Sequence, residues 1–293
     1  MPTLKSVVKS FIPASLRSRI RQLQTTKRTV LRPSEMPEWE WQPQWNQELS
    51  ASGWNDPSVA AAQLEKWPYF VEMLSGADPF GVSHEAPVGS GNQSIWAHNL
   101  IATYGYVLGL AAHSRQQLSM LDWGGGIGHY SVINTALVPQ VAIQYHCEDV
   151  PSLCAAGRTV LPDAIFHDQP GSSFANSYDF VHVGSSLWYV ENWKEMSIKL
   201  AQSTRDYLYI TRMMFVENAP SFVVLQRPYK YGYKTEYQCW ALNKREFVEH
   251  IENQGFKQTR EFLFGWGPEI HAAPEAGFFK GFLFRRTEGV KIR

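Results

Sequence analysis

The chain of 293 residues, 44% of them hydrophobic and 14% aromatic, is long enough to bury one large core or a core with an attached subdomain. Its formal net charge is zero, so no field of the whole molecule favours nucleic acid, and we expect no nucleic-acid partner. The three cysteines, Cys147, Cys154 and Cys239, lack metal-ligand spacing and cannot all pair, which favours a reducing cytoplasm, and the apolar strand pattern around Cys147 predicts a buried thiol there.

Residues 1–32 differ from the rest of the chain in charge. They carry eight Lys or Arg and no Asp or Glu, whereas the remainder carries 19 basic and 27 acidic side chains. The stretch "LKSVVKSFI" places apolar residues at helical spacing, with Lys5 and Lys9 on the other side. This pattern is typical of a helix lying on an anionic membrane surface. The alternative is a helix pair that packs on the domain or docks on a partner.

The expected location follows from the apolar segments. No stretch is apolar enough to span a bilayer, and the first residues show no secretory signal. We therefore expect a cytoplasmic protein, with residues 1–32 as a peripheral contact with the inner membrane.

Residues 33–93 are expected to form a cap region. Residues 33–56 are rich in Pro and Trp, and aromatic side chains at this density rarely stay in solvent, so we expect them to cover the core rather than line a cleft. A helix is predicted from Pro57 to about Trp67, because Asp56 and Pro57 are typical of a helix start and Pro68 would break it. A loop then leads to a buried helix over 94–114.

From Leu118 onward, strands alternate with helices. Strands are predicted at 118–123, 141–147, 163–167, 178–184, 206–212, 257–264 and 277–286. Helices are predicted at about 129–137, 151–158, 191–203 and 243–254. This alternation predicts an α/β fold with a mostly parallel sheet and helices on both faces.

The stretch "LDWGGGIGHY", residues 121–130, places a glycine-rich turn between a strand and a helix. In such sheets, ligands bind beyond the carboxyl ends of the strands, and glycine lets the backbone approach them closely. Gly124, Gly126 and Gly128 give the spacing G-x-G-x-G, whereas a dinucleotide site needs G-x-G-x-x-G. This disfavours a nicotinamide-dependent oxidoreductase, and no phosphate-binding P-loop occurs in the sequence.

"LDWGGGIG" resembles the first motif of class I S-adenosylmethionine-dependent methyltransferases. The resemblance implies that Asp122 lies near the methionine part of S-adenosylmethionine, with the backbone of the three glycines against it. It implies that Glu148, with Asp149 as a less favoured alternative, binds the ribose hydroxyls. It also implies that Asp168, or His167 in its place, contacts the adenine amino group.

The segment "SSLWYV" resembles the part of these enzymes that flanks the cofactor, with Ser185, Ser186 and Tyr189 matching. The wider layout resembles a little-studied bacterial branch of methyltransferases encoded among surface-polysaccharide genes. The resemblance implies a Rossmann-like, doubly wound sheet of seven strands, mostly parallel, with a helical N-terminal extension. We therefore expect three parts, namely 1–32, 33–93 and a cofactor-binding domain over 94–293.

Methyl transfer to a hydroxyl group is helped by a general base, and histidine is the usual side chain for that role. His129 directly follows the glycine loop, and His271 lies in a loop between the last two strands, so both are candidates. His182 lies within a strand and is expected to be a core residue. No metal-binding constellation is visible in the sequence.

Arg212 ends a strand at the ligand side of the sheet, where it could hold a carboxylate, a phosphate or a sugar hydroxyl. Tyr237 and Trp240, in "TEYQCW", are candidates for an aromatic wall. We therefore expect O-methylation of a sugar or other small hydroxyl acceptor in bacterial glycan or secondary metabolism. The alternative is a catalytically silent, methyltransferase-like scaffold that docks through its basic arm.

Overall fold

The computed structural model describes residues 36–47, 49, 53–82 and 94–287. Residues Pro37–Arg293 form one compact unit. The predicted basic arm and its helices lie outside the described residues. The predicted boundary between residues 93 and 94 adjoins a segment that is not described, and it stays a prediction.

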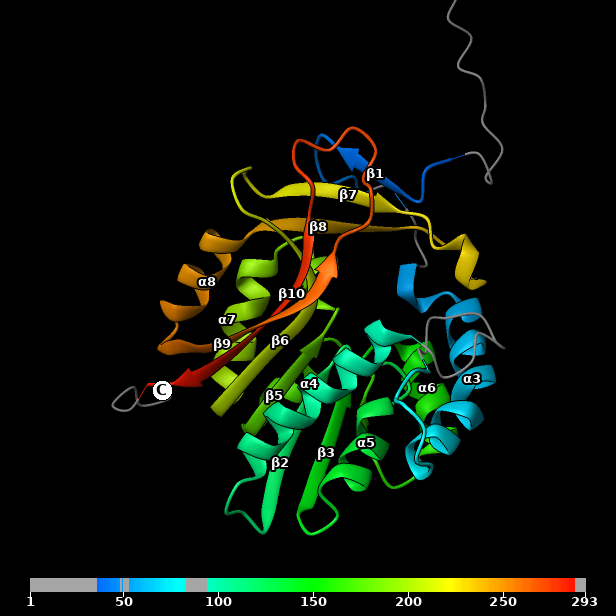
Figure 1. Ribbon diagram of the computed structural model, residues 1–293, viewed down its shortest axis with the longest axis vertical. Helices are drawn as coiled ribbons and strands as arrows, with labels where there is room; N and C mark the ends of the chain where they lie inside the picture. The colour runs from blue at the N-terminus through cyan, green and yellow to red at the C-terminus, as the bar shows by residue number, and fades with distance from the viewer. Residues whose placement is uncertain (1–35, 48, 50–52, 83–93, 288–293) are drawn as a thin grey trace, which may run out of the picture. The chain divides into compact units, whose positions relative to one another are not determined.

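Five parallel strands form the centre of the sheet, in the order β4-β3-β2-β5-β6 (Figure 1). They are β2 (Gln117–Trp123), β3 (Ala142–Glu148), β4 (Ile165–His167), β5 (Tyr178–Gly184) and β6 (Thr204–Val216). Each overlaps with a predicted strand because each contains an apolar run bounded by turn residues. The prediction of an α/β fold with a mostly parallel sheet is confirmed.

The sheet continues past β6 in two directions. β10 (Phe278–Arg286) pairs antiparallel with β6, and β9 (Phe256–Trp266) pairs antiparallel with β10. Three strands that were not predicted, β1 (Trp39–Gln42), β7 (Phe222–Gln226) and β8 (Tyr237–Asn243), extend the far end of β6 (Figure 1). The described residues therefore form a sheet of ten strands rather than the predicted seven. The reason is that β6 runs well beyond the predicted 206–212 and pairs with β8 through Phe215 and Val216.

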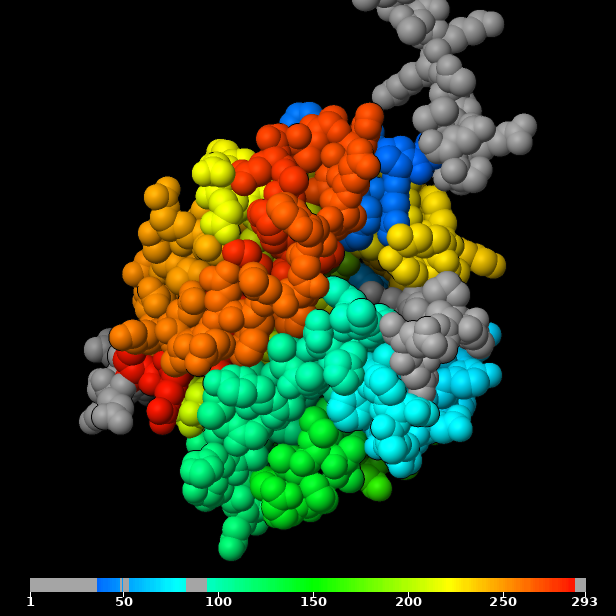
Figure 2. Space-filling model, viewed as in Figure 1, coloured from blue at the N-terminus to red at the C-terminus, as the bar shows by residue number. Residues whose placement is uncertain are grey.

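Helices cover both faces of the central sheet (Figure 1). Alternate residues of a strand point to opposite faces, so Phe180 packs beneath α4 (Ile95–Ala112), whereas its neighbour Val181 packs with α7 (Trp193–Ser203) and α8 (Lys244–Glu252). α5 (His129–Leu137) follows the glycine loop, and α6 (Pro151–Val160) follows β3. In the space-filling view, α4 and the strands β9 and β10 form much of the near surface (Figure 2).

The helix α3 (Pro57–Ser75) is longer than predicted. Asp56 caps its start by accepting a hydrogen bond from Ser58 N at 2.9 Å, as the sequence indicates. It then continues through Pro68, where a break was predicted. An internal proline destabilises a helix by about 3 kcal/mol, but burial of Phe70 and Met73 offsets this with about 1.5–3 kcal/mol each.

The Trp-rich segment before α3 packs on the domain, as predicted, but Trp39 and Trp54 of this segment also line a cavity, which was not expected. β1 pairs with β7, Trp45 stacks on Trp240, and Trp54 stacks on Tyr237 with ring centroids 4.4 Å apart. All three cysteines are buried free thiols, which was predicted for Cys147. No helix in the described part of the chain is both long and apolar enough to cross a membrane.

Candidate functional site

The glycine loop leaves the carboxyl end of β2 and leads into α5. Gly124, Gly126 and Gly128 have φ values of 73°, 61° and 95°, a region that side chains rarely adopt. A Cβ on Gly124 would lie 2.1 Å from the Cβ of Ser186, and the Gly124 N–H donates to the Glu148 carbonyl at 2.7 Å. The loop therefore needs glycine to pass between the ends of β3 and β5.

A cavity of about 330 Å³ lies above this loop, and we call it the switch-point cavity. The chain passes from β2 to β3 and β4 on one side and returns to β5 on the other, so the strand order reverses here. Open α/β sheets bind ligands at this point. The cavity is lined by Trp54, Gln63, Trp123 to Gly126, His129, Tyr130, Glu148 to Pro151, Leu153, Asp168, Pro170, Gly184 to Ser186, Tyr189, Val190 and Arg212.

Two adjacent carboxylates line the cavity where β3 ends. Glu148 accepts hydrogen bonds from the Gly171 N–H at 2.8 Å, the Ser173 N–H at 3.0 Å and the Trp123 indole at 3.2 Å. Asp149 accepts one bond on each oxygen, from the N–H groups of Gly126 and Val150, both at 2.7 Å. A carboxylate offers about four acceptor positions, so Asp149 keeps more capacity for a ligand diol than Glu148 does.

The end of β4 contributes a third acidic side chain. Asp168 lines the cavity, and its Oδ2 lies 3.0 Å from Arg158 Nη1, a hydrogen bond that lowers the pKa of the carboxyl. His167, the alternative for the same role, instead makes a 2.9 Å contact between its Nε2 and the Nδ1 of His146. Asp168 is therefore the residue of this pair that lies in the cavity wall.

Asp122 lies beneath the loop and does not line either cavity described here, which differs from the predicted contact with a ligand. Its carboxylate is fully buried, accepting from the Tyr145 hydroxyl at 2.6 Å and lying 2.8 Å from Nδ1 of His182. A Cβ on Gly125 would lie 2.4 Å from Asp122 Oδ2, so this carboxylate packs directly under the loop backbone. His182 is fully buried, as predicted for a core residue.

The two candidate bases have different surroundings. His129 lines the switch-point cavity at the start of α5, with its ring edge-on to Phe70 at a centroid distance of 4.8 Å. The side chain of His271 is exposed and lines neither cavity. Its backbone N–H and C=O pair with Trp39 and Trp41 of β1. The structure therefore does not bring His271 to either cavity, because the unpredicted strand β1 holds this loop.

A second cavity of about 350 Å³ adjoins the first, and we call it the aromatic cavity. Trp54, Ser185, Tyr189 and Arg212 line both cavities. Ten of its lining residues are aromatic, namely Trp39, Trp54, Trp96, Trp188, Tyr189, Tyr231, Tyr233, Tyr237, Trp266 and Phe279. Its other lining residues are Ser94, Ser185, Arg212, Gln226, Pro228, Lys230, Gly267 and Pro268.

The structure separates the two predicted wall residues of "TEYQCW". Tyr237 lines the aromatic cavity, but Trp240 does not. Trp240 stacks on Trp45 and donates from its indole to the Val190 carbonyl at 3.1 Å. The two residues lie three positions apart in β8 and so face opposite sides of the strand. The structure therefore does not bring Trp240 to the wall of the aromatic cavity.

Ser185 and Arg212 lie at the boundary between the two cavities in the same unusual backbone conformation. Their φ values are 59° and 57°, and the Ser185 N–H donates to the carbonyl of Thr211 at 2.9 Å. A residue with a side chain in this left-handed region is strained by roughly 1–2 kcal/mol, and such strain clusters at functional sites. Arg212 is only 6% exposed, and its guanidinium carbon lies 5.2 Å from the centre of the Trp96 ring.

Several lining residues were not predicted. Gln63 of α3 accepts a hydrogen bond from the Ile127 N–H at 3.3 Å, Trp54 comes from the segment expected to cover the core, and Trp96 comes from the predicted buried helix over 94–114. The available signal was the density of tryptophans before α3. This density indicated that the tryptophans are buried, but the sequence pattern does not distinguish residues of a cavity wall from residues of the core.

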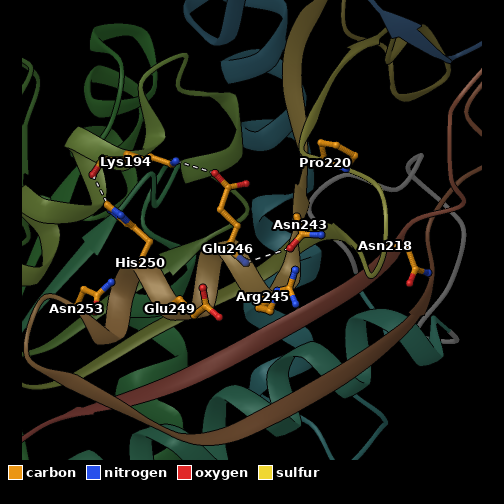
Figure 3. A pocket seen from close by; sticks show the side chains of 9 residues that line it. All are labelled: Lys194, Asn218, Pro220, Asn243, Arg245, Glu246, Glu249, His250 and Asn253. Carbon is orange, nitrogen blue, oxygen red and sulfur yellow. Dashed lines mark hydrogen bonds and ion pairs between the residues drawn. The ribbon is translucent and has the colours of Figure 1, made fainter.

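A third depression lies beside α8 and contains no predicted site residue (Figure 3). Polar groups of its lining residues form ion pairs and hydrogen bonds with one another. Lys194 Nζ lies 2.7 Å from Glu246 Oε1, and the Glu246 N–H donates to Asn243 Oδ1 at 3.1 Å (Figure 3). None of its lining residues lines the switch-point or the aromatic cavity, so it is not part of the candidate site.

No model of a known family and no curated protein matches the chain. Solved structures similar to it include magnesium protoporphyrin IX methyltransferase from Synechocystis PCC 6803 with bound SAH, at 15% identity and a TM-score of 0.46, covering 78% of this chain and 96% of that one. Another is the N-terminal domain of EvdMO1 in the presence of SAH and D-fucose, at 13% identity and a TM-score of 0.47, covering 76% and 97%. A third is the Burkholderia thailandensis 1,6-didemethyltoxoflavin-N1-methyltransferase with bound S-adenosylhomocysteine, at 14% identity and a TM-score of 0.44, covering 84% and 94%.

Proposed function

We propose that this chain is an S-adenosylmethionine-dependent methyltransferase that methylates a hydroxyl group of a sugar or another small acceptor in bacterial glycan or secondary metabolism. The observation that carries the proposal is the pair of adjoining cavities. The switch-point cavity combines a glycine loop with three carboxylates, and the aromatic cavity shares a wall with it. A transferase needs this arrangement, because the donor and the acceptor must meet with water excluded.

The residues of the switch-point cavity fit the donor. The polar carboxylates of Glu148, Asp149 and Asp168 lie on one side, where they would hold the ribose hydroxyls and the adenine amino group. The loop backbone would pass against the methionine part. When bound, S-adenosylmethionine would supply the methyl group of its sulfonium to an acceptor oxygen, with the C–S bond broken and S-adenosylhomocysteine released as the neutral thioether. The cavity volume falls within the range of small-molecule sites, roughly 300–1,000 Å³.

The same geometry disfavours a nicotinamide dinucleotide. A pyrophosphate binds to N–H groups at the turn before the helix. Here the Gly126 N–H already donates a hydrogen bond to the Asp149 carboxylate at 2.7 Å. An anion at this turn would lie beside a negative charge, which supports an uncharged or cationic part of a ligand at the loop.

The chain's own contribution to catalysis would be to position the acceptor and to remove its proton. His129 is the remaining candidate for the general base, since it lines the donor cavity and His271 lies outside both cavities. Tyr189 and Trp54 line both cavities and would hold the acceptor against the donor. Their rings are edge-on to one another at a centroid distance of 5.0 Å, so they form one continuous apolar wall.

Isothermal titration calorimetry with S-adenosylhomocysteine tests the proposal. We expect micromolar binding by the full chain and at least tenfold weaker binding by Glu148→Ala and Asp149→Ala. Glu249→Ala, on the depression beside α8, is the matched control and should bind like the wild type. A folded wild-type protein that shows no binding at millimolar ligand would end the proposal.

A further inference from the structure

We propose that Gln63 of α3 binds the carboxylate at the amino-acid end of S-adenosylmethionine through its side-chain amide. The inference rests on the proposed function, in that the switch-point cavity is assigned to the methyl donor. It goes further by adding a donor-binding residue from the cap region, outside the glycine loop and the strands, and by naming the group that this residue selects.

The amide of Gln63 lies against the glycine loop. Its Oε1 accepts the hydrogen bond from the Ile127 N–H at 3.3 Å. A Cβ on Gly126 would lie 2.8 Å from this Oε1 and 3.5 Å from Nε2. Gln63 and Gly126 both line the switch-point cavity, although the exposed fraction of Gln63 is only 3%. The amide is therefore a buried polar group where the loop borders the cavity.

The protein leaves the Nε2 group of Gln63 without a partner. An amide NH₂ group can donate two hydrogen bonds. In the part of the chain that the structure describes, the side chain of Gln63 makes one hydrogen bond, through Oε1, and Nε2 donates none. Buried donors are nearly always hydrogen-bonded, because leaving one unpaired is costly. An oxygen of a ligand in the cavity would supply the partner.

The backbone donors of the loop are already used within the protein. The loop N–H groups that donate to protein oxygens, at 2.7 to 3.3 Å, are those of Gly124, Gly126, Ile127 and Gly128. A ligand oxygen placed against the loop therefore cannot pair with these four groups. The amide of Gln63 is the donor that lies beside them.

The hydrogen-bonding groups of S-adenosylmethionine indicate which oxygen this is. Its ribose hydroxyls and adenine amino group would donate to the carboxylates of Glu148, Asp149 and Asp168. Its amino-acid end, expected against the loop, carries a carboxylate that only accepts hydrogen bonds, and an ammonium that balances its charge. This lack of net charge suits a loop that already holds the Asp149 carboxylate.

Arg212 also lines the cavity, but it belongs to a more distant strand. β6 is separated from β2 by β5, and neighbouring strands lie about 4.8 Å apart, so the ends of β2 and β6 are about 10 Å apart. Gln63, in contrast, touches the loop that follows β2. A carboxylate at the loop is therefore assigned to Gln63.

Two ligands that differ only in this carboxylate test the inference by isothermal titration calorimetry on the full chain. S-adenosylhomocysteine carries it, and S-adenosyl-3-thiopropylamine is the same molecule without it. We expect the wild type to bind S-adenosylhomocysteine about tenfold more tightly than the propylamine, or better. Equal affinities would overturn the inference and leave the proposed function standing. A folded chain that binds neither ligand would contradict the proposed function itself.

Two substitutions then assign the preference to Gln63. Gln63→Glu keeps an oxygen for the Ile127 N–H but replaces the donor with a second oxygen. It should weaken S-adenosylhomocysteine about tenfold or more, while the propylamine binds at least as tightly as to the wild type. Gln63→Leu removes the whole amide and should bring the two affinities within about threefold of one another.

Gln238→Glu is the matched control. Gln238 is also a buried glutamine, 8% exposed, but it lines neither cavity, so the ratio of the two affinities should stay that of the wild type. All variants are compared at a temperature at which circular dichroism shows them to be folded. If Gln63→Leu weakens both ligands by the same factor, Gln63 only supports the loop through Ile127. If it changes neither affinity, another side chain, such as Arg212, binds the carboxylate. Either result would overturn the inference.

Discussion

Asp149 Oδ2 accepts a hydrogen bond from the backbone N–H of Gly126 at 2.7 Å, which ties the end of β3 to the glycine loop after β2. The other oxygen of the same carboxylate accepts from the Val150 N–H. Burial raises the pKa of Asp149 to about 6, although these two backbone hydrogen bonds act in the opposite direction. The loop is therefore held by a carboxylate whose charge is disfavoured by its surroundings.

Asp149 should make stability depend on pH in an unusual direction. Its pKa is higher in the folded state than in the unfolded chain, so the folded state binds more protons between pH 3.8 and about 6. The contribution of Asp149 to the free energy of unfolding is thus largest below pH 3.8 and is lost as the pH rises through 6. Relative to Asp149→Asn, the wild type should lose up to about 1.4 kcal/mol per pH unit in this window.

Urea unfolding of both proteins from pH 4 to pH 8 measures this difference. The free energy of unfolding of the wild type, minus that of Asp149→Asn, should decrease as the pH rises to 6 and stay constant above pH 6. An increase of this difference with pH would show that the site stabilises the charged Asp149 carboxylate instead of destabilising it.

His146 and His167 should produce a pH dependence of the opposite sign. Burial lowers the pKa of both imidazoles, and the proximity of His167 lowers that of His146 further. The unfolded chain therefore binds more protons than the folded one just below pH 6.5, and the free energy of unfolding falls as the pH drops through that region. In His146→Gln, the decrease of the free energy of unfolding with falling pH should be smaller by up to about 1.4 kcal/mol per pH unit. Equal slopes for wild type and variant between pH 5 and 6.5 would contradict this.

The central strands could be predicted because each is a local apolar run, whereas the edge extension could not. β1 pairs with β7 across more than 180 residues, and no local pattern specifies such a partner. The same lack of a local sequence signal explains why the positions of three site residues could not be predicted. His271 is held by β1, Trp240 faces away because β8 is a strand, and Asp122 lies under the loop because Tyr145 and His182 bond it there.

The glycine loop itself could be predicted, because its backbone needs positive φ angles and glycine is the residue type that adopts them readily. Gly124→Ala would place a Cβ 2.1 Å from that of Ser186 at a φ of 73°. We expect a loss of about 2 kcal/mol in stability, from the left-handed strain and the displaced Ser186, and at least tenfold weaker S-adenosylhomocysteine binding.

Gly109→Ala in α4 is the matched control for that substitution. Nothing lies within 4 Å of a Cβ at Gly109, and alanine is favoured over glycine within a helix, so stability should rise by roughly 0.5–1 kcal/mol. Adding Ser186→Gly to Gly124→Ala removes the colliding Cβ and should restore part of the affinity. Unchanged binding by Gly124→Ala alone would mean that the loop backbone does not need glycine at this position.

The basic arm, residues 1–32, remains a proposal that lies outside the described residues. Its eight cationic side chains would each contribute about 1 kcal/mol near an anionic leaflet, for those that reach the surface. Salt screens this attraction, so binding should weaken steeply as ionic strength rises. Co-sedimentation of the full chain with anionic vesicles, but not with zwitterionic ones, is the expected result, and neutralising Lys5 and Lys9 with glutamine should reduce the bound fraction. If the full chain stays in the supernatant with both vesicle types at low salt, the arm has another role, such as packing on the domain.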